Sequence, residues 1–202
     1  SSVKNISDYA FNNCSELSEI NIINKKTESI GKYAFNNCKK LTNIDISSVK
    51  NISDYAFNNC SELSVIDIPN IESIGLYAFK DCKKMYLKSQ MFNVTTISDG
   101  AFYGCSNFKY CPNLNNLEYS EPLSLGKINC INKDTFKGCE ALKYVDLTNI
   151  ITSIGESSFE GCKSLIALYN EVKNLKTINK RAFYDCANLT TINIQSLTDI
   201  GD

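Results

Sequence analysis

The sequence contains ten cysteines and no histidine, so cysteine is its main candidate nucleophile and metal ligand. Cysteine thiolates attack electrophiles, hold zinc or pair as disulfides. Eight of the ten recur at one fixed place, three residues after a repeated phenylalanine: Cys14, Cys38, Cys60, Cys82, Cys105, Cys139, Cys162 and Cys186. A cysteine used once per repeat in one environment behaves as a small buried hydrophobic residue. We therefore expect a ladder of free thiols, and the two cysteines off this pattern, Cys111 and Cys130, are the better disulfide candidates.

No other pattern in the sequence predicts catalysis or a bound cofactor. The absence of histidine removes the commonest general base and the commonest zinc ligand. There is no Cys-x-x-Cys pair, glycine-rich phosphate loop or nucleophile elbow. A net charge of -1 argues against a nucleic acid or an anionic membrane as the partner, and no apolar run within this fragment is long enough to enter a bilayer. We expect a protein that is not an enzyme and holds no metal or cofactor.

The cysteines belong to a tandem repeat that occupies the whole chain. Its anchor is a phenylalanine that occurs eight times, at steps of 22 to 34 residues: Phe11, Phe35, Phe57, Phe79, Phe102, Phe136, Phe159 and Phe183. Periods of 20 to 50 residues are typical of solenoids, in which each repeat packs mainly on its neighbours. We therefore expect one domain over residues 1–202. Because Ile200 to Asp202 restart the repeat, we expect it to be a fragment of a longer array.

Each position within the repeat has a physical interpretation. Isoleucine stands five residues before every anchor and is expected in the core. Four residues before the anchor only Ser, Gly or Asn occurs, which suits a helix N-cap and predicts a short helical turn. Two residues after it only Asn, Asp or Gly occurs, which predicts a left-handed backbone conformation. The motif Leu-x-x-Ile-x-Ile that follows has the period-2 spacing of a half-buried strand. The tyrosines two residues before the anchor, Tyr9, Tyr33, Tyr55 and Tyr77, are expected to pack between neighbouring turns.

The fourth and fifth repeats, at 83–130, are irregular. In the fourth, the expected inward positions hold Lys88 and Gln90, so we expect a bulge or a re-registered strand over 87–91. The fifth takes 34 residues and carries an insertion. Insertions in solenoids map to loops on one face, often the binding face, so the loop at 111–130 is a candidate contact.

The unit Ile-Gly-x-Tyr-Ala-Phe-x-x-Cys-x-x-Leu-x-x-Ile-x-Ile, as in Ile30 to Ile46, resembles the BspA-like, or Treponema pallidum type, leucine-rich repeat. The resemblance covers the whole chain. It implies an α/β fold, a right-handed leucine-rich-repeat solenoid with a parallel β-sheet on the concave face and short helical turns on the convex face. It further implies a cell-surface or secreted protein, since several family members are implicated in adhesion to host extracellular-matrix proteins such as fibronectin and fibrinogen.

The outward side chains of the predicted sheet are the candidate site for a protein partner, because tyrosine is enriched at interface hot spots. With the irregular region, the candidates are Asp45, Asp67, Leu87, Met91, Tyr110, Tyr144, Asp146 and Tyr169. We expect Tyr110, Tyr144 and Tyr169 to form one continuous run. Three alternatives stay open: these are ordinary solvated residues, the chain is a cytoplasmic scaffold array without a single ligand, or the same face binds a glycan.

Overall fold

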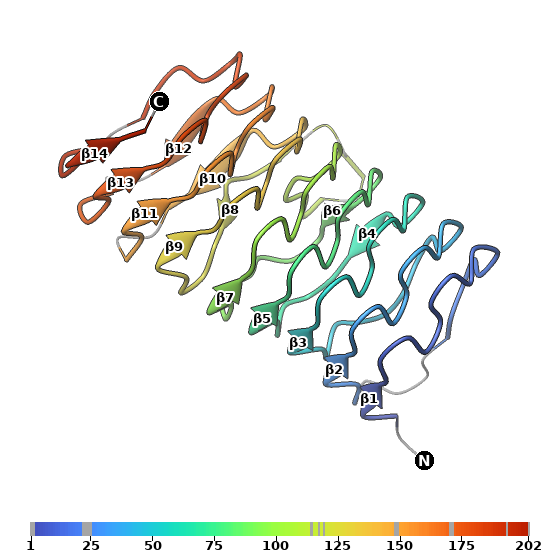
Figure 1. Ribbon diagram of the computed structural model, residues 1–202. Coiled ribbons are helices and arrows are strands. Elements are labelled where there is room, and N and C mark those ends of the chain that lie inside the picture. The colour runs from blue at the N-terminus through green and yellow to red at the C-terminus, as the bar shows by residue number, and fades with distance from the viewer. Residues whose placement is uncertain are drawn as a thin grey trace.

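The computed structural model describes residues 3–21, 26–113, 115–116, 118, 120–147, 150–169, 172–192 and 194–201. The chain forms a solenoid of about eight turns, one per repeat, with its two ends at opposite ends of the stack (Figure 1). The described residues form short strands and tight turns but no helix. The part of the chain that the structure describes therefore contains no helix that could cross a membrane.

The strands form two columns of parallel pairs along the stack. The first column holds the isoleucine five residues before each anchor and makes two sheets, β1 (Asn5–Ile6), β2 (Ser29–Ile30), β3 (Asn51–Ile52), β5 (Ser73–Ile74) and β7 (Thr96–Ile97), then β9 (Cys130–Ile131), β11 (Ser153–Ile154), β13 (Thr177–Ile178) and β14 (Asp199–Ile200). The second column is made of β4 (Val65–Ile66), β6 (Tyr86–Leu87), β8 (Leu123–Ser124), β10 (Tyr144–Asp146) and β12 (Ala167–Tyr169). The sequence predicted the second column only.

The predicted helical turns are wrong, and backbone dihedrals give the reason. In the second repeat the amide groups of Ala34, Asn36 and Cys38 each donate to the carbonyl three residues earlier, at 3.1–3.2 Å. This succession of tight turns cannot wind into a helix because Tyr33 and Asn37 have φ of 55° and 60°. The left-handed conformation predicted two residues after each anchor is confirmed in all eight repeats. A second left-handed position, two residues before it, was not predicted.

The irregular repeats change the register of the second column. Leu87 pairs with Ile66. Within its repeat, however, Leu87 lies one residue closer to the anchor phenylalanine than Ile66 does within its own. The strand register has therefore shifted by one residue, which confirms the re-registration predicted for 87–91. Leu87 and Met91 are consequently fully buried. In the fifth repeat Tyr110 pairs in parallel with Leu87 and antiparallel with Glu121. The chain then continues into β8, which pairs with β10, so the insertion adds an extra rung to the column.

Ladders of identical side chains fill the interior between the columns. Consecutive anchor phenylalanines stack with ring centroids 5.1–5.6 Å apart from Phe11 to Phe183. The eight isoleucines five residues before them are buried as predicted. All ten cysteines are free, which confirms the ladder of free thiols, and six of the eight in the ladder are buried as predicted. Cys14 is exposed and Cys186 half-buried, because they belong to the first and last repeats. The disulfide suggested for Cys111 and Cys130 is wrong: the Cys111 thiol lies 3.5 Å from the Asn113 carbonyl oxygen, and the Cys130 thiol lies 3.5 Å from Asn132 Oδ1.

Candidate functional site

The outward side of the second strand column is here called the strand face. Strand alternation creates it: Val145 points into the core and is fully buried, while its neighbours Tyr144 and Asp146 are half-buried on the outside. Tyr144 pairs with Ala167 and Asp146 with Tyr169, so the two tyrosines are diagonal neighbours. Their rings meet edge to face at 5.5 Å and 72°. The Tyr169 side chain keeps 44% of its surface exposed.

Tyr110 does not share this face: it pairs with the fully buried Leu87, so its side chain points to the core side, where it packs partly buried against the hydrophobic core. The segment 121–124 pairs with Tyr110 on one side and with β10 on the other. The continuous run predicted for Tyr110, Tyr144 and Tyr169 is therefore wrong, because the insertion supplies a rung between the first and second tyrosine. Burial, then the nearby Glu121 carboxylate and the Cys111 thiol, raise the pKa of the Tyr110 hydroxyl above its usual value.

Gln90 holds the inserted rung against the fourth repeat. Its Nε2 donates to the Pro122 carbonyl oxygen at 2.9 Å, and its Oε1 accepts from the Ser124 amide at 2.8 Å. A side-chain amide thereby replaces two backbone partners that a regular strand would supply. The one-residue shift of register that turns Leu87 inward also places the Gln90 side chain within hydrogen-bond distance of the inserted rung.

The acidic candidates have partners within the fold. The Ser47 amide and hydroxyl both donate to Asp45 Oδ1, at 3.1 and 2.7 Å. Asp67 forms an ion pair with Lys88 at 3.2 Å across neighbouring repeats. Leu87 and Met91, predicted as contact residues, are wrong as surface positions because both are fully buried.

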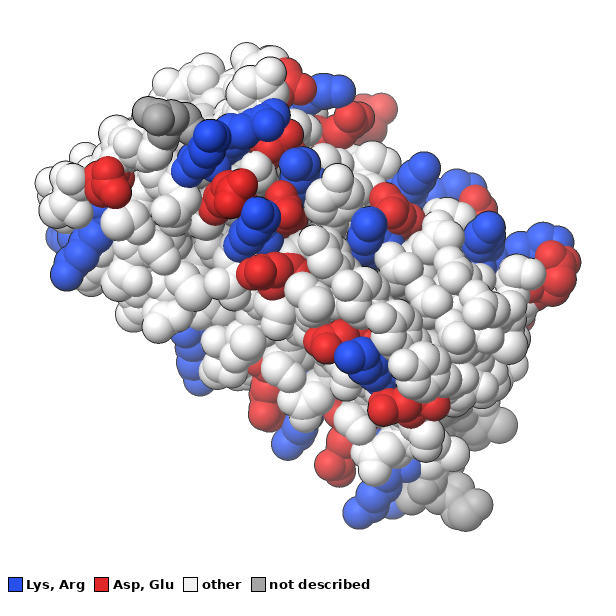
Figure 2. Space-filling model, viewed as in Figure 1, with Lys and Arg blue, Asp and Glu red and all other residues white. Residues whose placement is uncertain are grey.

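Charge is evenly mixed over the surface. Lys40–Glu16, Lys84–Glu62 and Lys163–Glu140 pair between successive repeats at 2.5–2.9 Å. Figure 2 shows lysine and arginine interspersed with acidic residues and no large patch of one sign on the face in view. Such a surface does not steer a strongly charged partner.

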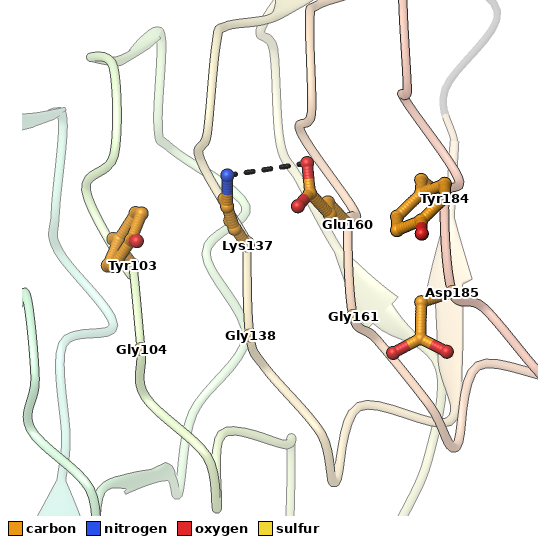
Figure 3. Close-up of a pocket in the computed structure, with 8 residues that line it drawn as sticks. All are labelled: Tyr103, Gly104, Lys137, Gly138, Glu160, Gly161, Tyr184 and Asp185. Carbon is orange, nitrogen blue, oxygen red and sulfur yellow. Dashed lines mark ion pairs between the residues drawn. The ribbon is translucent and has the colours of Figure 1, made fainter.

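A second feature, on the turns between the two strand columns, was missed from the sequence. It is a hollow of about 230 Å³ with a wall of Tyr103, Lys137, Glu160 and Tyr184 (Figure 3), and we call it the glycine trough. Its floor is formed by Gly104, Gly138 and Gly161. The signal was present in the sequence, because the position two residues after the anchor changes from Asn or Asp to Gly in three successive repeats.

Glu160 is the electrostatic centre of this wall. Its Oε2 lies 3.3 Å from Lys137 Nζ and its Oε1 lies 3.2 Å from the Arg181 guanidinium. Burial favours the protonated acid, but the Ser157 hydrogen bond and the Lys137 and Arg181 charges outweigh it and hold the pKa of the Glu160 carboxyl below its usual value.

A polar hollow of about 420 Å³ lies beside the first strand column in the N-terminal half, near Asp8, Lys32 and Asp54. Its carboxylates already accept hydrogen bonds from backbone amides of the neighbouring repeat. Asp8 Oδ1 accepts from the Lys32 amide at 2.7 Å, and Asp54 Oδ1 accepts from the Leu76 amide at 2.9 Å. No group of three or more Cys, Asp or Glu residues that could hold a metal ion occurs among the residues described.

Comparison with known proteins identifies the repeat. The model of the BspA type leucine rich repeat region matches residues 1–109 and 106–202, in six copies. Comparison with curated proteins gives no match. The solved leucine-rich repeat protein of T. pallidum is similar in fold, with a TM-score of 0.65 and 23% identity over 81% of this chain and 72% of that chain. A leucine rich cell surface protein from Faecalibacterium prausnitzii A2-165 matches with a TM-score of 0.43 and 20% identity over 96% of this chain and 77% of that chain. The family match spans both halves of the solenoid, and the chain therefore belongs to the BspA-type leucine-rich repeat family.

Proposed function

We propose that this chain is a non-catalytic protein-binding domain that contacts its partner through the strand face. The observation that carries the proposal is the edge-to-face pair of Tyr144 and Tyr169, which leaves a large and partly exposed aromatic surface on a rigid sheet. Aromatic side chains that are already held in one geometry lose little conformational freedom on binding, so they suit an interface centre.

The inserted rung widens this surface. The strand β8 within the insertion pairs with β10 and so extends the sheet next to Tyr144. Polar groups accompany the tyrosines on this face: Asp146 is half-buried beside Tyr169, and the ion pair of Asp67 with Lys88 lies farther along the column. A partly apolar centre with a polar rim is the usual anatomy of a protein interface.

We further propose that the domain acts at the cell surface or after secretion, as part of an adhesin, and that its partner is an extracellular-matrix or cell-surface protein. The membership in the BspA-type family supports this, since the resemblance stated above points to adhesion. The mixed surface charge is consistent with a protein partner.

The test is binding of the whole chain to fibronectin and to fibrinogen, measured by biolayer interferometry. We expect the double variant Tyr144→Ala/Tyr169→Ala to bind at least about tenfold more weakly, as expected when a hot spot is removed. Tyr9→Ala is the matched control, because Tyr9 is 54% exposed but lies on the turns rather than on the strand face. Absence of binding to both proteins would contradict the matrix partner, and unchanged affinity of the double variant would contradict the strand face.

A further inference from the structure

The glycine trough interrupts a covering of side chains that protects the turns in the N-terminal half. There, two amide ladders run along the stack. Asn36 and Asn58 belong to one, and the Asn58 amide donates to Asn36 Oδ1 at 2.7 Å. Asn37 and Asn59 belong to the other, where the Asn59 amide donates to Asn37 Oδ1 at 2.8 Å. In the C-terminal half the second ladder is replaced by glycines, and the backbone below it is left open.

The open part of the floor lies over Gly138 and Gly161. A Cβ atom on Gly138 would meet only Gly104 backbone atoms, the nearest at 3.5 Å, and one on Gly161 would meet only Gly138 backbone atoms, both at 3.8 Å. At the other end Asp81 already covers Gly104, because a Cβ there would collide with the Asp81 carboxylate. The trough is thus unfilled at two rungs and closed at one end.

In the wall beside this floor, two charged side chains, Lys137 and Glu160, lie between the tyrosines at its ends (Figure 3). Tyr184 stands at one end with 59% of its surface exposed and the Arg181 guanidinium 4.4 Å from its ring centre. Tyr103 stands three rungs away, half-buried. The anchor rings step by 5.6, 5.3 and 5.4 Å over these rungs, so the trough is roughly 16 Å long, as expected for slightly splayed strands.

The charges along the wall are balanced. Lys137 and Arg181 both pair with Glu160, and Asp185 adds a second carboxylate at the end of the floor. Lys80, which lies over the Tyr103 ring at 5.1 Å, and Asp81, which covers Gly104, add one further charge of each sign. The trough therefore has no surplus that would select a charged ligand. The spare donors and acceptors of these side chains remain in place to bind hydroxyl groups.

The backbone of the floor excludes a peptide that adds as a strand. The amide of Gly104 donates to the Lys137 carbonyl, that of Gly138 to the Glu160 carbonyl and that of Gly161 to the Tyr184 carbonyl, at 2.7–2.8 Å. With these donors already used, no free ladder is available for strand addition. A ligand must be recognised by the wall side chains and by contact with the flat glycine floor.

We infer that the glycine trough is a binding site for an uncharged oligosaccharide. Such a ligand is elongated, has no charge, presents C–H faces to aromatic rings and the glycine floor, and presents hydroxyl groups to Lys137 and Glu160. This site is separate from the strand face and does not depend on the function proposed for it. A sequence with Asn in place of Gly138 would lack the site, because the amide ladder would continue over it.

The experiment is NMR titration of the whole chain with a panel of neutral oligosaccharides built from glucose, galactose, mannose or N-acetylglucosamine. We expect saturable shifts with at least one member. Gly138→Asn/Gly161→Asn should weaken that binding at least about tenfold by refilling the trough. The double variant is expected to fold, because Asn adopts the same left-handed conformation at Asn37 and Asn59. A thermal unfolding midpoint close to that of the parent chain checks this.

Tyr184→Ala should also weaken binding, whereas Tyr144→Ala/Tyr169→Ala on the strand face should leave it unchanged. The inference is overturned if no member of the panel binds, if the refilled variant binds as tightly as the parent chain, or if an unrelated peptide occupies the trough in preference to every sugar. Since the strand-face variant is tested in parallel, failure of the trough and failure of the protein-binding proposal are distinguishable.

Discussion

The thiol of Cys60 donates a hydrogen bond to the carbonyl oxygen of Phe35, one repeat earlier, at 3.0 Å. The same contact joins Cys82 to Phe57 and Cys105 to Phe79. The Cys60 side chain therefore fills a small buried space and also gives the Phe35 carbonyl, which already accepts from the Cys38 amide, a second hydrogen-bond donor. This double role explains why cysteine, rather than alanine or valine, recurs in every repeat.

The buried thiols predict a loss of stability at alkaline pH. Burial, and then the neighbouring thiols, raise the pKa of Cys38 to about 12 from 9.0. Between these values the unfolded chain loses a proton that the folded chain keeps, so the free energy of unfolding falls as pH rises above about 9, by up to about 1.4 kcal/mol per pH unit for each thiol. Urea unfolding between pH 7.5 and 10.5 measures this slope. Cys38→Ala should make it shallower, and an unchanged slope in that variant would contradict the assignment.

The phenylalanine ladder predicts a large cost for losing one anchor. Phe57 is fully buried and stacks on Phe35 and Phe79 at 5.2 Å on each side. We expect Phe57→Ala to lower the free energy of unfolding by about 3–5 kcal/mol, as for other buried aromatic residues. Phe92→Ala is the matched control, because Phe92 is 62% exposed and its loss should cost less than about 0.5 kcal/mol. Equal destabilisation by the two changes in a denaturant titration would show that the ladder does not hold the stack together.

The left-handed turns predict a particular order of two substitutions at Asn59. This residue has φ of 60° and its amide donates to Asn37 Oδ1. Asn59→Gly removes the hydrogen bond, worth about 0.5–1.5 kcal/mol. Asn59→Ala removes it and also places in the left-handed region a Cβ without the short polar side chain that lets Asn tolerate this conformation, at a further cost of about 1–2 kcal/mol. Thermal unfolding should therefore rank the parent chain above the Gly variant and the Gly variant above the Ala variant. An Ala variant as stable as the Gly variant would contradict this account.

Much of this fold can be predicted from the residue types allowed at each position of the repeat, and the left-handed position of Asn37 is the clearest case. There the sequence allows only Asn, Asp or Gly, so the residue types themselves reveal the backbone. The equivalent φ at Tyr33 was not predicted, because tyrosine seldom adopts it, and without it the Ser/Gly column was wrongly read as a helix cap. The strand Ser29–Ile30 is only two residues long, so no alternation exists to detect.

The candidate site was less predictable than the fold. Tyr144 and Tyr169 are on one face because regular strands carry them, and alternation sufficed to place them. Leu87 and Met91 were misplaced because a one-residue change of register turns a strand over, and the pairing that decides the register is not local. The rung at 121–124 depends on the Gln90 amide, a contact between residues more than 30 positions apart that no spacing rule reveals.

Glu160 predicts an acid-dependent contribution to stability in the C-terminal half. Its ion pairs and the Ser157 hydrogen bond hold the pKa of its carboxyl below 4.5, so the charged form stabilises the folded chain. This contribution is present above about pH 4.5 and is lost as pH falls through the folded-state pKa, since the folded carboxyl then takes up a proton as well. The difference in unfolding free energy between the parent chain and Glu160→Gln should therefore be positive at pH 7 and shrink below pH 4.5.

Glu140→Gln is the matched control for this prediction. Glu140 also pairs with a lysine, Lys163 at 2.9 Å, but half of each side chain is exposed, and exposed pairs contribute at most about 1 kcal/mol. Its pH dependence should accordingly be weak. If chemical denaturation at pH 3 and pH 7 gives Glu160→Gln and Glu140→Gln the same small difference, the Lys137 and Arg181 charges do not stabilise Glu160, and the wall of the glycine trough is less rigid than the ion pairs indicate.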